Sequence, residues 1–225
     1  MNFKIKSINY ISLLAKKKIC AEVIKNIRAS FNTFPEIAYT KWQTNLNITI
    51  PRDNFLNIFE NMYHLTRDPK LLIFKYKLLH RNIITNRNLK MWDSNKPLSE
   101  QRSDNCTFCN RYPEFIEHLL YDCYVIKTLW NSILNWIFQC TNLRVNFSRS
   151  EILLGNLPQE LQIFNLIFMI TTRYIYDCKC FSTNPNIFLL KYKIKQYFLA
   201  EKLIAEQNDK IQSFRSKWDI LYECF

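Results

Sequence analysis

The stretch CTFCNRYPEFIEHLLYDC, residues 106–123, contains three cysteines and one histidine at the spacing C-x2-C-x8-H-x4-C. Two thiolates separated by two residues can bind one metal ion from a single tight turn. A histidine and a third thiolate then complete the set of three sulfurs and one nitrogen that zinc favours. The predicted ligands are Cys106, Cys109, His118 and Cys123. Because four protein ligands leave no open coordination position, the site is expected to be structural, not catalytic.

The residues between the ligands predict how they converge. Pro113 suits the first position of a helix, and the following residues to Tyr121 read as a short helix that carries His118. Cys123 follows His118 by five residues, which is about 140° around a regular α-helix. The helix must therefore end near Asp122 if both side chains are to face one ion.

The alternative is that three unrelated thiols and a buried histidine happen to lie close together in a chain with eight cysteines. The other five show no ligand spacing and are expected to be core or surface thiols; they are Cys20, Cys140, Cys178, Cys180 and Cys224. A disulfide framework is not expected in a chain of this length without a secretory signature. A reducing compartment, nuclear or cytoplasmic, is favoured.

Gly155 is the single glycine among 225 residues. Gly-rich phosphate loops, dinucleotide fingerprints and nucleophile elbows are therefore excluded. Tight hairpins, which need residues with positive φ, are disfavoured as well. We expect a mainly α fold, a helical bundle with the small zinc module inserted.

The charge balance points to a polyanionic partner. Thirty-one Lys and Arg against 19 Asp and Glu give a formal net charge of +12. Nucleic acid is the simplest such partner, an anionic membrane surface is the next, and a merely basic protein is the alternative without one. The longest apolar run, residues 166–170, is far shorter than the roughly 20 residues that a membrane span needs, so no membrane partner is expected. The basic N-terminus leaves a mitochondrial presequence as a weak alternative.

Apolar periodicity and proline positions predict helices over residues 8–29, 51–65, 70–81, 125–137, 158–178 and 186–207, with continuation of the last to residue 218 as an alternative. A short turn is expected to end at Gly155 in a left-handed conformation. The final long helix is predicted to bury Phe188, Leu189, Tyr192, Leu199 and Leu203. The expected organisation is an N-terminal helical connection (1–40), a helical region containing the zinc module at about 104–124 (41–140), and a C-terminal helical region (141–225).

Two helices are expected to carry basic faces. Lys70, Lys77 and Arg81 fall within about 40° of one another on a regular helix and span roughly 17 Å, enough to follow several phosphates. A second set falls within a similar arc and comprises Lys191, Lys195 and Lys202. A solvated helix face is the alternative reading of either set.

Several segments together resemble one family. They are Lys41-Trp42, FKYKLLHR at 74–81, the cysteine and histidine segment with Trp130, Leu153-Leu154-Gly155, residues 165–167, and the stretch from Glu201-Lys202 to Lys217-Trp218. The chain resembles the C-terminal, zinc-binding region of non-LTR (LINE-type) retrotransposon reverse transcriptases over most of residues 40–218. The resemblance implies a part in holding element RNA, target DNA or their hybrid during target-primed reverse transcription. It also implies that residues 1–40 derive from the thumb-side connection.

The expected function is that of a zinc-stabilised nucleic-acid-binding segment. Phosphates would meet Lys70, Lys77, Arg81, Arg87 and Lys90, and unpaired bases of RNA or single-stranded DNA would stack on Phe108 or Tyr112. No Tyr/Phe-x-Asp-Asp motif occurs, so no catalysis is expected. The alternatives are a zinc module that docks onto a reverse transcriptase polymerase domain, and an enzyme that requires divalent metal.

Overall fold

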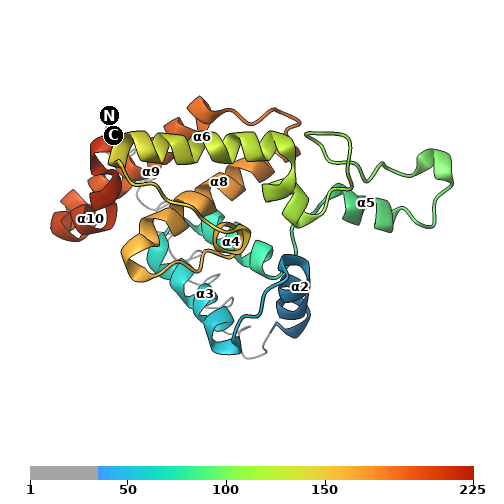
Figure 1. The fold of residues 1–225 in the computed structure, drawn as a ribbon, viewed down its shortest axis with the longest axis horizontal. Helices are drawn as coiled ribbons and strands as arrows, with labels where there is room; N and C mark the ends of the chain where they lie inside the picture. Colours follow the sequence, from blue (N-terminus) through green and yellow to red (C-terminus); the bar gives the residue numbers. More distant parts are fainter. Residues whose placement is uncertain (1–34) are drawn as a thin grey trace, which may run out of the picture.

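A computed structural model describes residues 35–225 (Figure 1). Its longer helices are α2 (Glu36–Leu46), α3 (Arg52–Leu65), α4 (Pro69–Leu79), α5 (Asn86–Trp92), α6 (Tyr124–Thr141), α7 (Arg149–Leu154), α8 (Gln162–Cys180), α9 (Ile187–Gln207) and α10 (Ile211–Trp218). Short 3₁₀ turns are η2 (Leu98–Glu100), η4 (Gln159–Leu161) and η5 (Asp219–Cys224), and η3 (His118–Asp122) is a π turn. The mainly α fold is confirmed for this part of the chain, where the β-pairing found is an isolated bridge between Asn105 and Pro113. The helix predicted over 8–29 lies outside the described residues.

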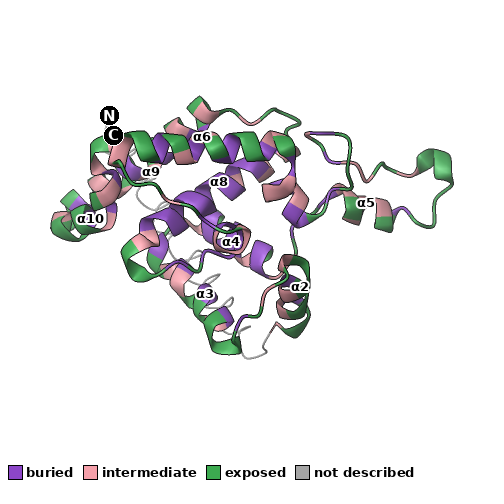
Figure 2. Ribbon diagram, viewed as in Figure 1, coloured by how far each residue is buried: buried purple, intermediate pink, exposed green. Residues whose placement is uncertain are grey.

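Helix α8 is the centre of the bundle. Thirteen of its residues are buried, from Ile163 to Cys178, because it is apolar on nearly all sides. It packs against α3, α4, α7, α9 and the η3 turn. In Figure 1 it lies beneath α6, and the buried colouring of Figure 2 is concentrated on α8 and α4. Within residues 35–225 no helix combines the length and apolarity needed to cross a bilayer.

Helix α4 is held at both ends by side chains. The Asp68 side chain accepts a hydrogen bond from the backbone N–H of Lys70, and Pro69 occupies the first turn. At the other end, the indole N–H of Trp42 donates to the Leu79 carbonyl over 2.9 Å. The helix ends at Leu79, two residues earlier than predicted, because Arg81 adopts a left-handed backbone with φ of 59°.

Helix α7 ends as its sequence predicts. Ser148 and Glu151 form a reciprocal capping box at its start. Gly155 has φ of 72° and donates its N–H to the Glu151 carbonyl, which confirms the left-handed end expected for the single glycine. A side chain here would also be crowded, since a Cβ on Gly155 would lie 3.3 Å from Nζ of Lys75.

Lys75 is a buried cation that sequence periodicity did not identify. Its Nζ donates to the Leu153 carbonyl over 2.9 Å, close to the C-terminus of α7, where the helix dipole favours a positive group. Desolvation by burial lowers its pKa from 10.5 to about 7. The folded chain therefore binds this proton far less tightly than the unfolded chain does.

This difference predicts a stability that rises with pH. Between about pH 7 and 10.5 the unfolded state holds the Lys75 proton and the folded state releases it, so the free energy of unfolding increases across this window. Lys75→Met should remove about 3 kcal/mol of the rise between pH 7 and 9.5. Urea unfolding at a series of pH values measures it. Lys77→Met, on the exposed face of the same helix, should keep the wild-type slope; equal slopes for Lys75→Met and wild type would contradict the prediction.

The inward face predicted for α9 is wrong. Phe188, Leu189, Tyr192, Leu199 and Leu203 are all exposed. The buried residues are Leu190, Ile194, Phe198 and Ala205. The helix is apolar on both sides, so periodicity did not separate the two faces.

Packing of the C-terminal residues decides which face is buried. Helix α10 follows a break in which Asp209 has φ of 54°. It then places Trp218 edge-on against Phe198, with ring centroids 5.3 Å apart. Lys217 and Trp218 both donate to Glu201, each over 2.8 Å. The division into regions 1–40, 41–140 and 141–225 stays a prediction.

Candidate metal centre

The four predicted ligands converge. The ligand atoms of Cys106, Cys109, His118 and Cys123 all lie within 4.8 Å of one another. The sulfurs of Cys106 and Cys123 are 3.8 Å apart, and Nε2 of His118 lies 3.3 Å from the Cys109 sulfur. With a Zn–S bond of about 2.3 Å, a tetrahedral site has sulfur–sulfur edges of about 3.8 Å. The donor set and its spacing therefore fit zinc, and Cys106, Cys109 and Cys123 are buried.

The first two ligands lie on a compact turn. The Cys106 carbonyl accepts from the N–H of Asn110 over 2.9 Å, and Asn110 closes the turn with φ of 50°. The N–H of Cys106 donates to the Tyr112 carbonyl over 2.8 Å, beside the isolated bridge to Pro113. Asparagine tolerates this left-handed conformation, so the turn forms without glycine.

A π turn allows His118 and Cys123 to face one ion, although they would lie about 140° apart on a regular α-helix. The N–H of Cys123 donates to the His118 carbonyl over 2.9 Å, an i to i+5 bond instead of the usual i to i+4 bond. The wider turn brings Cys123 towards the side that His118 faces, which a regular helix would not do. The prediction that the helix ends at Asp122 is confirmed, and Cys123 is extended, with ψ of 131°.

The thiols of Cys106 and Cys123 change each other's pKa. The hydrogen bond between Cys106 and Cys123 lowers the pKa of Cys123 to about 5 and raises the pKa of Cys106 well above its usual value. A divalent cation favours thiolates at both positions, so zinc binding releases the protons that these thiols hold.

Glu114 anchors the turn that carries the first two cysteines. Its side chain is fully buried and accepts from the N–H and the hydroxyl of Thr107, each over 2.7 Å. The same carboxylate accepts from the N–H of Asn86 at the start of α5 and lies 3.6 Å from Nζ of Lys179 on α8. One acid therefore ties the zinc turn to two helices, an arrangement of the kind that orients metal ligands.

Glu114→Gln should weaken zinc binding by about 10–100-fold, the usual cost of losing a partner that orients the ligands. The amide would turn a donor towards the Thr107 N–H and hydroxyl or towards the Asn86 N–H. Competition with a chromophoric chelator measures the affinity. Glu100→Gln, at an exposed position on η2, is the control and should bind zinc as the wild type does. An unchanged affinity in Glu114→Gln would show that the turn forms without the carboxylate.

The structure does not place Arg81 on the basic face with Lys70 and Lys77. Arg81 lies beyond the end of α4 and forms an ion pair of 2.5 Å with Glu117, with side-chain exposures of 11% and 4%. Its guanidinium also lies 4.4 Å from the centre of the Trp42 ring. The expected helical stripe of Lys70, Lys77 and Arg81 is therefore not formed, although Lys70 and Lys77 are exposed on α4. Phosphate binding by Arg81 stays a prediction.

The remaining predicted contact residues have varied surroundings. Arg87 and Lys90, on α5, both pair with Asp104 and remain partly exposed. On α9, Nζ of Lys191 lies 5.4 Å from the Trp136 ring centre. Lys195 is exposed and Lys202 is partly exposed.

Of the two aromatic candidates in the zinc turn, one faces the core. Phe108 is half-buried against it, whereas Tyr112 is exposed. The Tyr112 ring lies 5.7 Å from the ring of His118.

Sequence reasoning missed the acids that hold the module. Glu117 accepts from both Arg81 and Asn45. Burial raises its pKa, but the hydrogen bond and charge of Arg81, with the amide of Asn45, lower it overall. The available signal was an acidic residue on each side of the apolar pair Phe115-Ile116, within the segment that joins the metal ligands.

A closed three-cysteine, one-histidine site that joins a tight turn, a π turn and the following helix defines a zinc-stabilised helical module. Residues 39–130, which contain the site and α3 to α5, match the family model described as zinc-binding in reverse transcriptase. The match supports a zinc-binding domain similar to those associated with reverse transcriptases in this part of the chain. No curated protein matches the chain.

Proposed function

We propose that the chain is the nucleic-acid-binding C-terminal segment of a reverse transcriptase of the non-LTR, LINE type, and that zinc stabilises it. The observation that carries the proposal is the closed site within a segment matching a reverse transcriptase zinc-binding family. The net charge of +12 supports a polyanionic ligand, RNA or single-stranded DNA. The seven described cysteines are free, which fits a reducing compartment, nuclear or cytoplasmic.

The phosphate contacts we propose follow from exposure. Lys70 and Lys77 are exposed along α4, and Lys195 is exposed on α9. Arg87 and Lys90 share one carboxylate, Asp104, so the pair keeps a net positive charge. Arg81 is left out because its charge is neutralised by Glu117 inside the fold.

Salt dependence tests this proposal. Fluorescence anisotropy with a labelled single-stranded RNA should show affinity falling steeply from 50 to 200 mM salt, with a log–log slope of about −0.7 per phosphate contact. Lys70→Glu/Lys77→Glu should bind at least about tenfold more weakly and with a shallower slope. Lys210→Glu/Arg215→Glu, exposed near and on α10, changes the net charge equally and is the control. A flat salt response, or equal losses in both double variants, would argue against phosphate binding by α4.

The second candidate is a docking module for a polymerase domain. It is favoured by Met91, Trp92 and Leu98, large apolar side chains that are exposed on the arm carrying α5 and η2. This arm projects from the bundle beside the zinc module (Figure 1). Trp92→Ala should then weaken binding to the polymerase domain without changing RNA affinity.

We further propose that the chain has no catalysis of its own. Among the described residues, the group suited to hold a metal is the cysteine and histidine cluster. Its four ligands leave a bound zinc ion with no open coordination position for a substrate. Synthesis or cleavage of nucleic acid by the purified chain that requires Mg²⁺ would refute this part of the proposal.

A further inference from the structure

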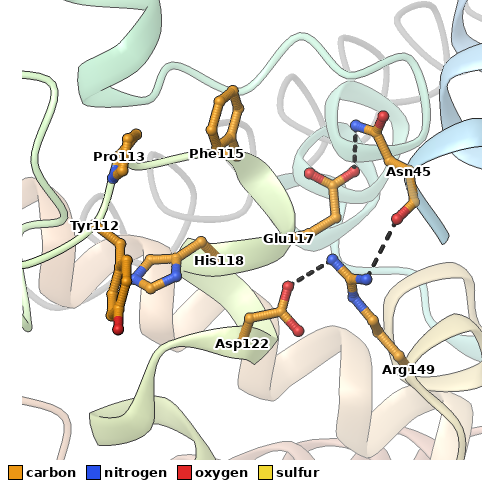
Figure 3. Close-up of a pocket in the computed structure, with 8 residues that line it drawn as sticks. All are labelled: Asn45, Tyr112, Pro113, Phe115, Glu117, His118, Asp122 and Arg149. Carbon is orange, nitrogen blue, oxygen red and sulfur yellow. Dashed lines mark hydrogen bonds and ion pairs between the residues drawn. The ribbon is translucent and has the colours of Figure 1, made fainter.

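A cleft of about 470 Å³ opens beside the metal centre, between the end of α2, the zinc module and the start of α7 (Figure 3). We call it the Tyr112 cleft and define it by Asn45, Tyr112, Phe115, Glu117, Asp122 and Arg149. Its volume falls in the range of small-molecule sites. None of the phosphate contacts proposed above lies in it.

One side of the cleft is aromatic. Tyr112 and Phe115 are 60% and 46% exposed, although both belong to the compact zinc module. The ring of Tyr112 lies 5.7 Å from the ring of His118, and the ring of Phe115 lies 5.6 Å from the guanidinium of Arg87. The turn that holds Cys106 also fixes Tyr112, since the Tyr112 carbonyl accepts from the Cys106 N–H. Both rings therefore line the cleft and keep part of their surface exposed.

The other side is polar and ordered by ion pairs. Arg149 donates to Oδ2 of Asp122 over 2.5 Å and to the Asn45 carbonyl over 3.3 Å, and Asn45 donates to Glu117 over 3.0 Å. In Figure 3 these groups lie on the opposite side of the view from Tyr112, with His118 between Tyr112 and Asp122. The Arg149 bond uses Oδ2 of Asp122 and leaves Oδ1 for a donor that enters. Nε of Arg149 is buried and has no partner within the described part of the chain.

Cationic side chains lie near the mouth of the Tyr112 cleft. Lys127, exposed on the first turn of α6, and Arg149 both act electrostatically on Asp122. Arg111 is exposed next to Tyr112, and its guanidinium lies 5.4 Å from the centre of the Tyr124 ring. A chain of phosphates can therefore pass the mouth of the cleft while a group attached to it enters.

These features match one ligand chemistry. An unpaired nucleobase has two apolar faces and an edge of donors and acceptors, and it is attached to a phosphate strand. Aromatic stacking binds the face, a carboxylate accepts from an exocyclic amino group, and cations meet the phosphates. We propose that the Tyr112 cleft binds one splayed base of a single-stranded RNA or DNA, with preference for a base that carries an amino group. The inference rests on the proposed nucleic-acid function and specifies where the base lies.

Two series of measurements test it, with the zinc-loaded full chain and labelled 12-nucleotide strands. Tyr112→Ala should weaken oligocytidine binding by about 5-fold or more, the loss expected for one stacked base. The salt slope should stay unchanged, because no phosphate contact is removed. Tyr112→Phe should restore binding. Wild-type protein should bind oligocytidine more tightly than oligouridine, and Asp122→Asn should reduce that difference.

The controls separate folding from binding. Phe181→Ala removes an exposed aromatic side chain far along the chain, at the end of α8, and should leave affinity unchanged. Zinc content and melting temperature of Tyr112→Ala should equal those of wild type. The wild type and Tyr112→Ala should bind a blunt duplex with the same affinity, since a paired base cannot enter the cleft.

The outcomes distinguish this inference from the proposed function. If the wild type binds RNA with a steep salt slope but Tyr112→Ala binds equally well, the cleft does not take a base and the proposed function stands. If no strand binds at any salt concentration, both are wrong. If Tyr112→Ala instead weakens binding to a polymerase domain alone, the cleft is a protein contact.

Discussion

Replacing Cys123 by serine should abolish stoichiometric zinc binding and lower the melting temperature by roughly 8–16 °C. A ligand that binds only the folded state stabilises it by about 4 kcal/mol at a free concentration a thousand times its Kd. Each kcal/mol corresponds to about 2–4 °C for a chain of this size. The effect should be large because Cys123 is the last ligand before α6 and touches the Cys106 sulfur at 3.8 Å.

Calorimetry with and without a chelator measures this effect. Wild-type protein treated with chelator should melt near the temperature of Cys123→Ser, and the chelator should not change the variant further. Cys180→Ser removes an exposed thiol outside the site and should melt as the wild type does, with one zinc per chain. If Cys123→Ser retains stoichiometric zinc, or melts with the wild type, the metal does not hold this fold.

Replacing Arg81 by methionine should cost about 3–5 kcal/mol of unfolding free energy, because Glu117 would be left as a buried, uncompensated charge. Arg81 donates to Glu117 over 2.5 Å, and both side chains are almost inaccessible. The guanidinium also stacks on Trp42. Lysine lacks the planar fork, so Arg81→Lys should recover only part of the loss.

Urea unfolding at neutral pH measures the cost. Arg52→Met is the matched control, since the Arg52–Glu36 pair is exposed on both sides, and it should cost at most about 1 kcal/mol. Equal losses for the two variants would mean that burial does not distinguish the pairs. A phosphate-binding role for Arg81 predicts the opposite pattern, a change in RNA affinity with unchanged stability.

The sequence predicted the metal centre well because its information is local. Four ligands within 18 residues have a spacing that few other structures need, and the same segment was one of those on which the family resemblance rested. The end of α7 could be predicted equally well, because a glycine after an apolar turn commonly ends a helix in the left-handed conformation. Gly155 has φ of 72°, as expected.

The errors concern contacts between distant residues. Arg81 meets Glu117 across 36 residues, and Lys75 meets Leu153 across 78. Helical periodicity placed Arg81 on the solvent side because it assumed that α4 continues past Leu79. Helix α9 is apolar on two sides, and its packing against α10, α8 and α6 decides which side is covered. Such choices depend on the tertiary partners and are not encoded in the periodicity of one segment.

The π turn at His118–Asp122 has a consequence for how a local ion acts on a large fold. The turn holds one residue more than an α-helical turn, and α6 follows it directly, with the Trp130 indole bound to the Leu120 carbonyl. If the extra residue were absorbed into a regular helix, α6 would rotate by about 100° relative to its surroundings. Ile126, Ile133 and Ile137, which are buried, would then turn away from the core. By binding both His118 and Cys123, the cation fixes the rotation of α6 about its own axis. It thereby determines which way the apolar side of this helix faces, over several turns.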